Sequence, residues 1–474
     1  MTPVPTGPAA PMPVVDIDLA EPGAFRRPGG RARAGPAGRA LGLVRLHGRP
    51  LGMAEATGRE PGELWQALAD AVLRDSPRAG AGAGAGPAPV GGDAPPVSVI
   101  VATRNRAGML RDCLDSLRAV EYPRFEVIVV DNAPADSSTK EMIRREYGAV
   151  RYVCEPVPGL ARAHNRGLAE ARGRIAAFTD DDTLVDPGWL TALAAPFLAD
   201  PGTGCVTGLI VPAELDTEAQ VALERHGAFA KGYAPRTWSL GAPSADPLFP
   251  FTAGRFGSGA NMAFRTELLR ELGGFDPATG VGTPARGGDD LLSFFRVLAR
   301  GRSLAYEPGA IVWHRHRRTP EALEAQAFGY GAGFGAYLAG ALAHEPRMLP
   351  ALLRRLPGGL RYALARSRAR AALAEGPDVG PHVRPDVRPD TGRDAGPGSG
   401  PGVASSRIAS LELRGLLYGP FGYLRSRRAE RRLRRLTAHD GRGAPAHGVP
   451  APPVARRKRG EGRWPGSPRA TDPS

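Results

Sequence analysis

Lysine, cysteine and aromatic residues are scarce in this sequence, and each shortage excludes a class of protein. Only three of the 62 lysine and arginine residues are lysines, so arginine supplies nearly all of the positive charge. The net charge is +14. The three cysteines form no CxxC pattern, which favours buried thiols in a reducing compartment over a zinc or redox motif. Aromatic residues make up 6% of the chain and are few in the arginine-rich tail, so we expect no specific nucleic-acid partner.

Long apolar runs are also missing. The first residues show no basic segment followed by an apolar run, so the sequence predicts no secretory signal and a cytoplasmic protein. The uncharged stretch 327–343 is rich in glycine and alanine, and it is too short and too weakly apolar for a membrane span. It therefore predicts a packed or interfacial helix.

Composition divides the rest of the chain into segments. With 63 glycines and 48 prolines, several of these segments read as linkers. We expect, in order, a disordered segment 1–40, a small N-terminal region 41–78 of unassigned role, a linker 79–96, an α/β domain 97–320, a helical extension 321–375, a Pro/Gly-rich linker 376–404, a basic helical segment 405–436 and a disordered tail 437–474.

Strand and helix patterns alternate within the α/β domain. Apolar runs typical of strands are separated by stretches with helical spacing of apolar residues. The expected strands are 97–103, 125–131, 150–154 and 174–179, and the expected helices are 109–117, 137–147 and 160–171. This alternation predicts a mostly parallel sheet flanked by helices. Ligands of such sheets bind at the carboxyl ends of the strands, where Asp131 and Asp180 both fall.

Three consecutive aspartates, Asp180, Asp181 and Asp182, end the strand 174–179. Side chains alternate along an extended chain, so Asp180 and Asp182 point to one side. Two converging carboxylates repel each other unless a cation lies between them, and Mg²⁺ or Mn²⁺ prefers oxygen ligands. The aspartates could instead cap a turn. Asp186 is expected to cap a helix that starts at Pro187.

Several motifs stand in a fixed order over about 96–320. They are VSVIVATRNR, VIVVDNAPADSS, GLARAHNRGLAEARG, TDDD, GGDDLLSFFR and VWHRHR. Together they resemble the motifs of bacterial family 2 glycosyltransferases, which are inverting enzymes with the GT-A fold that use nucleotide sugars. The resemblance implies a Rossmann-like, mostly parallel sheet flanked by helices, with additional C-terminal helices.

The resemblance also implies residues that bind the donor. Thr103 and Arg104 match the positions where the nucleotide is touched, and Asp131 matches the carboxylate that meets the base. The family often has an arginine directly before the asparagine of the third motif; this chain has His164 there. Arg162 is the nearby cation for the diphosphate.

The metal and catalytic residues follow from the last three motifs. Asp180 and Asp182 match the DxD pair, with Asp180 also near the nucleotide sugar, and His314 matches the third metal ligand. The implied cofactor is Mg²⁺ or Mn²⁺. Asp290 matches the catalytic base, and Asp289 stands where glutamate is common.

The residues also support this chemistry without the family. A nucleoside diphosphate leaving group needs its charge neutralised, and an acceptor hydroxyl needs a base. Each residue also has a structural interpretation: Asp289 and Asp290 could cap a helix, Asp131 could belong to a turn, and His314 could be a packed histidine. Their joint occurrence in this order favours the functional interpretation.

We therefore expect a hexosyltransferase or related enzyme that moves a sugar from a nucleotide-sugar donor to a hydroxyl acceptor on a glycan, a lipid-linked sugar or a secondary metabolite. One alternative is a sugar nucleotidyltransferase, although VATRNRAGM is not its glycine-rich triphosphate loop. Another is a non-catalytic GT-A protein that binds glycan or membrane. The basic segments 351–374 and 411–436 predict peripheral contact with the inner membrane face, or else only cover the catalytic domain.

Overall fold

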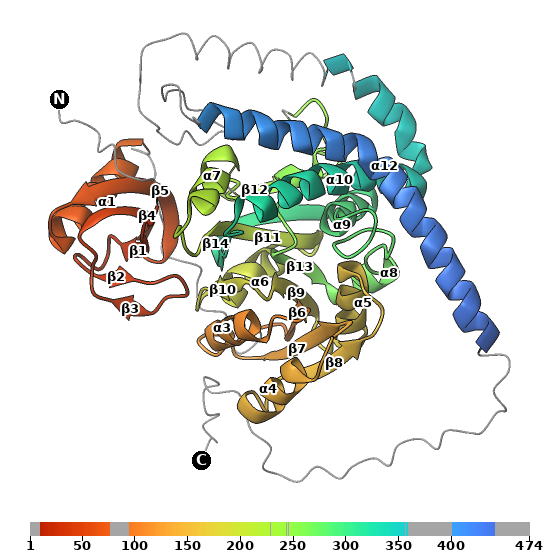
Figure 1. The fold of residues 1–474 in the computed structure, drawn as a ribbon, viewed down its shortest axis with the longest axis horizontal. Helices are drawn as coiled ribbons and strands as arrows, with labels where there is room; N and C mark the ends of the chain where they lie inside the picture. Colours follow the sequence, from red (N-terminus) through yellow and green to blue (C-terminus); the bar gives the residue numbers. More distant parts are fainter. Residues whose placement is uncertain are drawn as a thin grey trace.

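The computed structural model describes residues 10–75, 94–355, 357–358 and 401–440, except 228, 243 and 245. Within these residues the chain forms a five-stranded N-terminal sheet, a nine-stranded central sheet and a layer of long C-terminal helices (Figure 1). The tail from 441, the linker up to 93 and most of the linker 376–404 lie outside the described residues.

The first half of the central sheet is parallel. Its strands are β6 (Val97–Thr103), β7 (Phe125–Asn132), β8 (Arg151–Glu155) and β9 (Ile175–Asp180). They are connected by the helices α3 (Ala107–Leu117), α4 (Ser138–Glu146) and α5 (Leu160–Glu170). All seven residues of β6 are buried, as expected for a strand covered on both faces. This half matches the predicted strands and helices closely.

The second half of the central sheet mixes directions. Its strands are β10 (Thr183–Val185), β11 (Thr203–Pro212), β12 (Arg236–Trp238), β13 (Asn261–Arg265) and β14 (Ser303–His314). The order across the sheet is β10-β14-β11-β13-β9-β6-β7-β8, with β12 paired to β14. β13 runs antiparallel to both β9 and β11, whereas β11 and β14 are parallel. The fold is therefore mixed α/β, with a sheet of which one half is parallel-rich.

Helices complete the second half. They are α6 (Trp189–Ala199), α7 (Glu218–Gly227), α8 (Thr266–Glu271) and α9 (Asp289–Ala299). The prediction that Asp186 caps a helix starting at Pro187 is wrong, because α6 starts at Trp189 with Gly188 as its N-cap. The Asp186 carboxylate accepts a hydrogen bond from the Gly188 N–H at 3.1 Å and also faces Arg45.

The N-terminal segment is ordered where it is described, so the prediction of disorder over 1–40 is wrong for residues 10–40. Its strands are β1 (Val14–Asp18), β2 (Phe25–Arg26), β3 (Ala32–Arg33), β4 (Gly38–Leu46) and β5 (Arg49–Gly58), and its helix is α1 (Pro61–Asp75). α1 packs on one face of this sheet around Val15, Ile17 and Leu68. Proline, alanine, glycine and arginine make up most of 1–40, but the five buried residues of β1 are enough to build a strand once α1 covers them.

The opposite face of the N-terminal sheet packs on the central sheet. Met12, Val14 and Leu43 join Leu209, Ile311 and Trp313 in one apolar cluster, which includes side chains of β11 and β14. Arg45 lies between two buried carboxylates, at 2.7 Å from Asp16 and 2.7 Å from Asp186. The N-terminal sheet therefore forms a layer behind the strand that ends at His314.

Two long helices form the C-terminal layer of the structure. They are α10 (Pro320–His344) and α12 (Pro401–Asp440), and they pack along each other (Figure 1). The packing is close because glycines line it: a Cβ on Gly331 would lie 1.9 Å from the carbonyl oxygen of Glu412, and one on Gly419 would lie 2.4 Å from that of Ala332. α12 begins inside the expected linker 376–404. Among the described residues, no helix has the length and hydropathy that a bilayer span needs.

Candidate active site

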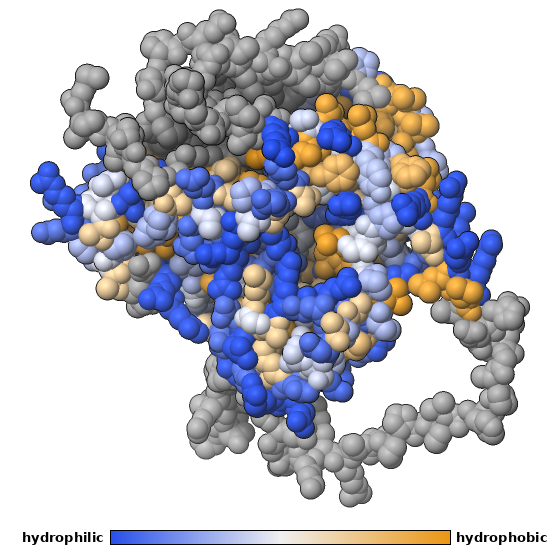
Figure 2. All heavy atoms as spheres, viewed as in Figure 1, coloured by the Kyte–Doolittle hydropathy of each residue, from blue (hydrophilic) through white to orange (hydrophobic). Residues whose placement is uncertain are grey.

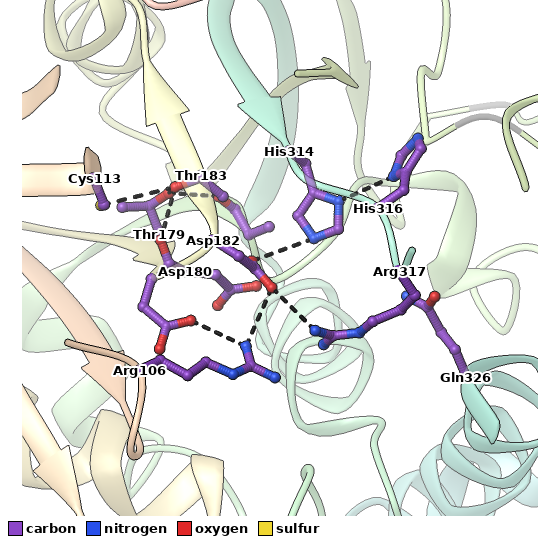
Figure 3. A network of polar contacts seen from close by, with 12 residues as sticks. Arg106, Cys113, Thr179, Asp180, Asp182, Thr183, His314, His316, Arg317 and Gln326 are labelled. Carbon is purple, nitrogen blue, oxygen red and sulfur yellow. Dashed lines mark hydrogen bonds and ion pairs between the residues drawn. The ribbon is translucent and has the colours of Figure 1, made fainter. Parts of the chain in front are cut away.

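Three ligand-type side chains meet where β9 ends. Asp180 closes β9, Asp182 follows two residues later, and His314 is the last residue of β14. β10 pairs with β14 in the register Thr183↔His314, so the chain returns directly beside the histidine. One ligand atom from each of Asp180, Asp182 and His314 lies within 4.8 Å of the other two. The structure thus brings together the three residues that the sequence predicted as metal ligands (Figure 3).

The two carboxylates differ in their electrostatic surroundings. Burial, and then the charge of Asp182, raise the pKa of Asp180 to about 7. Burial alone would raise the pKa of Asp182 too, but His314, Arg317 and Arg106 outweigh it and hold that pKa well below its usual range. In turn Asp182 outweighs burial and raises the pKa of His314. A cation at this point would relieve the repulsion between the carboxylates.

The cluster fits a divalent cation on its own chemistry. Carboxylate oxygens and an imidazole nitrogen suit hard and borderline divalent ions. Asp182 is only 4% exposed, and its buried Oδ1 has no hydrogen-bond partner, although His314 Nε2 lies 3.4 Å away. A buried carboxylate oxygen without a donor is the atom that a metal ion would satisfy.

Two arginines that the sequence interpretation did not select lie at the same carboxylates. Arg106 Nη1 lies 3.2 Å from Asp181 and 3.3 Å from Asp182, and Arg317 Nη1 lies 3.6 Å from Asp182 (Figure 3). Asp181 also accepts a hydrogen bond from the hydroxyl of Thr103 at 2.7 Å. Arg106 could have been selected from the sequence, because it is the last residue of the first motif and lies two residues after Arg104.

The residues predicted to contact the nucleotide differ in their burial and in their hydrogen bonds. Thr103 is buried and its hydroxyl donates a hydrogen bond to Asp181, while Arg104 is exposed. Asp131 is fully buried: its Oδ2 accepts from the Tyr152 hydroxyl at 3.0 Å, and its Oδ1 has no partner. Burial raises the pKa of Asp131. The unsatisfied oxygen is suited to accept an N–H from a ligand.

Asp290 stands in the first turn of α9. Its Oδ2 accepts a hydrogen bond from the Gly259 N–H at 2.8 Å, just before β13, which pairs with β9 in the register Asn261↔Thr179. Asp290 therefore lies at the same end of the sheet as Asp180. Burial, and then the neighbouring Asp289, raise the pKa of Asp290 to about 6.

Asp289 faces a different side. It is 4% exposed, and its Oδ2 lies 3.4 Å from Nδ1 of His164. His164 is buried between the rings of Phe178 and Phe275. The histidine at the position where the family often has arginine is therefore a core residue that joins α5 to the start of α9.

Arg162 does not reach the aspartate cluster in this structure. Its guanidinium forms an ion pair with Glu430 on α12, which covers this side of α5. The predicted contact of Arg162 with a diphosphate would require it to leave Glu430. Sequence reasoning could not anticipate this pair, because the two residues lie 268 positions apart.

Comparison with known proteins agrees with this geometry. Residues 98–273 match the family model described as glycosyl transferase family 2. A pre-mycofactocin glycosyltransferase of Mycobacterium tuberculosis is 30% identical over 222 residues, which cover 47% of this chain and 43% of the relative. A putative glycosyltransferase of Bacillus subtilis, EpsH, is 33% identical over 101 residues, covering 20% of this chain and 29% of the relative. The matches thus span less than half of each relative.

Among solved structures, this chain is similar to a mannosyltransferase from Pyrobaculum calidifontis in complex with GDP-Man and Mn²⁺. The identity is 24% and the TM-score 0.43, over 71% of this chain and 89% of that one. The family match extends from the second residue of β6 to the turn after α8, and so includes Asp131 and the three aspartates. Residues 98–273 of this chain therefore match a glycosyl transferase family 2 domain.

Proposed function

We propose that this protein transfers a sugar from a nucleoside diphosphate sugar to an acceptor hydroxyl by a single displacement that inverts the anomeric carbon. The observation that carries the proposal is the presence of two separate acidic centres at one end of the sheet. One is the Asp180–Asp182–His314 cluster, and the other is Asp290, held beside β13 through Gly259. A displacement needs both, one for the leaving group and one for the attacking hydroxyl.

The first centre serves the leaving group. Asp182, His314 and Asp180 would hold Mg²⁺ or Mn²⁺, which when bound neutralises charge on the diphosphate. Arg106 and Arg317, which already contact the aspartates, place two further positive charges beside it. Asp131 would accept an N–H of the nucleobase on its unpaired Oδ1. Thr103 supports the site by donating to Asp181, which keeps the aspartate loop in place.

The second centre serves the acceptor. Asp290 takes the proton of the acceptor hydroxyl while the hydroxyl oxygen bonds to the anomeric carbon. The bond from that carbon to the diphosphate oxygen breaks in the same step. The half-buried position of Asp290 suits a base, because its raised pKa of about 6 leaves it deprotonated yet basic at neutral pH. No covalent nucleophile is required, which is why the product is inverted.

The acceptor in this proposal is a hydroxyl on a glycan or a lipid-linked sugar. α12 exposes Leu417 and Phe421 together with several arginines. Such a face supports peripheral contact with an anionic membrane surface, which would bring a lipid-linked acceptor close to the catalytic domain.

A donor screen tests the proposed reaction. Purified protein is mixed with Mn²⁺ or Mg²⁺ and UDP-, GDP- or dTDP-sugars, with and without glycan acceptors, and released nucleoside diphosphate is measured. We expect acceptor-dependent release with one donor class, and a product of inverted anomeric configuration by NMR. Release of pyrophosphate from a nucleoside triphosphate and a sugar phosphate would instead identify a nucleotidyltransferase. Binding of donor without any turnover would indicate a non-catalytic protein.

A further inference from the structure

A second histidine lies behind the histidine of the aspartate cluster. His314 directs Nε2 toward Asp182, and its other ring nitrogen, Nδ1, lies 3.3 Å from Nδ1 of His316 (Figure 3). His316 is 3% exposed, so water does not satisfy its ring. It is not part of the cluster of metal-type ligands. Its position suggests that it acts on His314 rather than on a ligand.

The chain of contacts continues to a carboxylate. Nε2 of His316 lies 2.9 Å from Oε2 of Glu224 on α7, whose side chain is 19% exposed. Phe229 lies against both imidazoles, stacked on His316 with ring centroids 5.6 Å apart and tilted against His314 at 5.1 Å. The two rings are therefore held by packing as well as by hydrogen bonds. We call the hydrogen-bonded residues Glu224, His316 and His314 the Glu224–His316–His314 relay.

The chemistry of the three groups sets the direction of the hydrogen bonds. A carboxylate only accepts, so Nε2 of His316 carries the proton that it donates to Glu224. In a neutral imidazole the other nitrogen is then an acceptor, so Nδ1 of His316 accepts from Nδ1–H of His314. This leaves the lone pair of neutral His314 on Nε2, the nitrogen that faces Asp182.

We propose that Glu224 and His316 are positioning residues that hold His314 in the tautomer and orientation needed to bind a divalent cation together with Asp180 and Asp182. The proposal rests on the metal centre of the proposed function. A hydrogen-bonded partner on the far nitrogen fixes a ligand histidine and increases its basicity, and loss of such a partner commonly weakens metal binding by about 10- to 100-fold. In this chain the partner is a second histidine anchored by a carboxylate on another element.

The experiment measures Mn²⁺ binding to the full chain directly, by electron paramagnetic resonance of the free ion, without any sugar transfer. Glu224→Gln keeps the shape of the side chain and removes its charge, and His316→Gln removes the ring. We expect each to weaken Mn²⁺ binding by about tenfold or more. The matched control is Glu218→Gln, an exposed glutamate on the same helix, which should bind as the wild type does.

A double variant separates a relay from simple packing. If Glu224 acts through His316, the Glu224→Gln/His316→Gln protein should bind Mn²⁺ no more weakly than His316→Gln alone. Nitrogen-15 spectra of labelled histidines, assigned with His316→Gln, should show His316 protonated on Nε2 and not on Nδ1. Affinity of Glu224→Gln within twofold of the wild type, additive losses, or the opposite tautomer would overturn the relay while leaving the metal centre intact. A wild-type protein that binds no Mn²⁺ would overturn both.

Discussion

At the scale of single residues, the site separates carboxylates that are adjacent in sequence. Asp180 and Asp182 have the same chemistry, but of the two it is Asp182 that forms the ion pairs with His314, Arg106 and Arg317. Asp289 and Asp290 are consecutive, yet one contacts a buried histidine and the other the backbone N–H of Gly259. Successive residues of a helix point about 100° apart, which explains this division of contacts.

Asp182→Ala should abolish metal-dependent binding of a nucleoside diphosphate. The substitution removes the carboxylate whose low pKa keeps it ionised and available to the cation. Calorimetry with Mn²⁺ and UDP or GDP measures the effect. Asp70→Ala on α1, where the carboxylate accepts a hydrogen bond from Gln66, is the control and should bind normally. Unchanged binding by Asp182→Ala would remove this residue from the metal site.

Asp290→Asn should keep donor binding and lose transfer by about 10² or more, in line with the contribution of a general base. Asp289→Asn should be milder, because Asp289 contacts His164 in the interior. Steady-state kinetics of both variants, beside donor affinity by calorimetry, checks this. Near-normal turnover by Asp290→Asn with an inactive Asp289→Asn would reverse the two roles.

The pH profile provides an independent measure of the base. Because Asp290 must be deprotonated to accept a proton and its pKa is raised to about 6, kcat/KM should rise with pH below 6 and level off above it. Asp289→Asn removes a like charge, so the midpoint should move to lower pH in that variant. A midpoint that stays in place, or a rate that falls as pH rises through 6, would contradict the assignment.

At the scale of elements, α12 has two different faces. Gly415 and Gly419 pack on α10. The outward face carries Leu413, Leu417, Phe421 and Leu424, which are 58%, 75%, 59% and 53% exposed. These residues recur at spacings of three or four, so they form one stripe along the helix. Exposed arginines follow in the next turns, Arg425, Arg428, Arg431 and Arg435 among them. Figure 2 shows hydrophobic side chains gathered at the upper right, where both α12 and the helical segment that follows α10 lie in Figure 1.

Replacing part of this stripe should weaken binding to anionic vesicles. Leu417→Glu/Phe421→Glu removes two exposed apolar side chains and adds negative charge, so flotation with phosphatidylserine vesicles should show affinity reduced by about tenfold or more. Raising the salt concentration should weaken wild-type binding, since it screens the arginines. Leu198→Glu, on the exposed face of α6, is the control. Equal flotation of the double variant and the wild type would dismiss α12 as a membrane contact.

At the scale of the whole molecule, the N-terminal sheet is joined to the sheet that carries the candidate site. It packs on β11 and β14, and Trp313, the residue before His314, lies in the shared apolar cluster. The ion network of Arg45 with Asp16 and Asp186 joins the N-terminal sheet to the segment just after the aspartates. A region without an assigned role in the sequence therefore supports the strand ends that form the site.

Arg45→Met should destabilise the protein strongly, because it leaves two buried carboxylates without their cation. Breaking a buried ion pair costs about 3–5 kcal/mol, whereas an exposed pair contributes under about 1 kcal/mol. Arg39→Met is the matched control, since Arg39 lies on the same strand and pairs with the exposed Glu55. Chemical denaturation measures both. Equal losses for the two variants would show that the buried network adds nothing to the union of the two sheets.

Local sequence determined the parallel half of the fold and the identity of the acidic residues. The strands β6, β7 and β9 are continuous apolar runs, so consecutive residues of the sequence already predict that these strands are buried. β11 was not predicted, because two glycines and a terminal proline interrupt its apolar pattern, although all of its residues are buried. The strands of 10–40 were missed for the same reason: their composition resembles a linker, and only packing against α1 and β14 makes them strands.

The sequence by itself determined which residues we propose to carry the chemistry, because a motif is a set of neighbouring positions: Asp180, Asp182, His314 and Asp290 all stand in such motifs. Only the tertiary structure decided their partners. Arg317 with Asp182, Glu224 with His316, Arg45 with Asp186 and Glu430 with Arg162 are contacts between elements far apart in the chain. The physical reason is that charge and hydrogen bonding act over a few ångströms in space, and sheet register and helix packing, not sequence spacing, bring those atoms within reach.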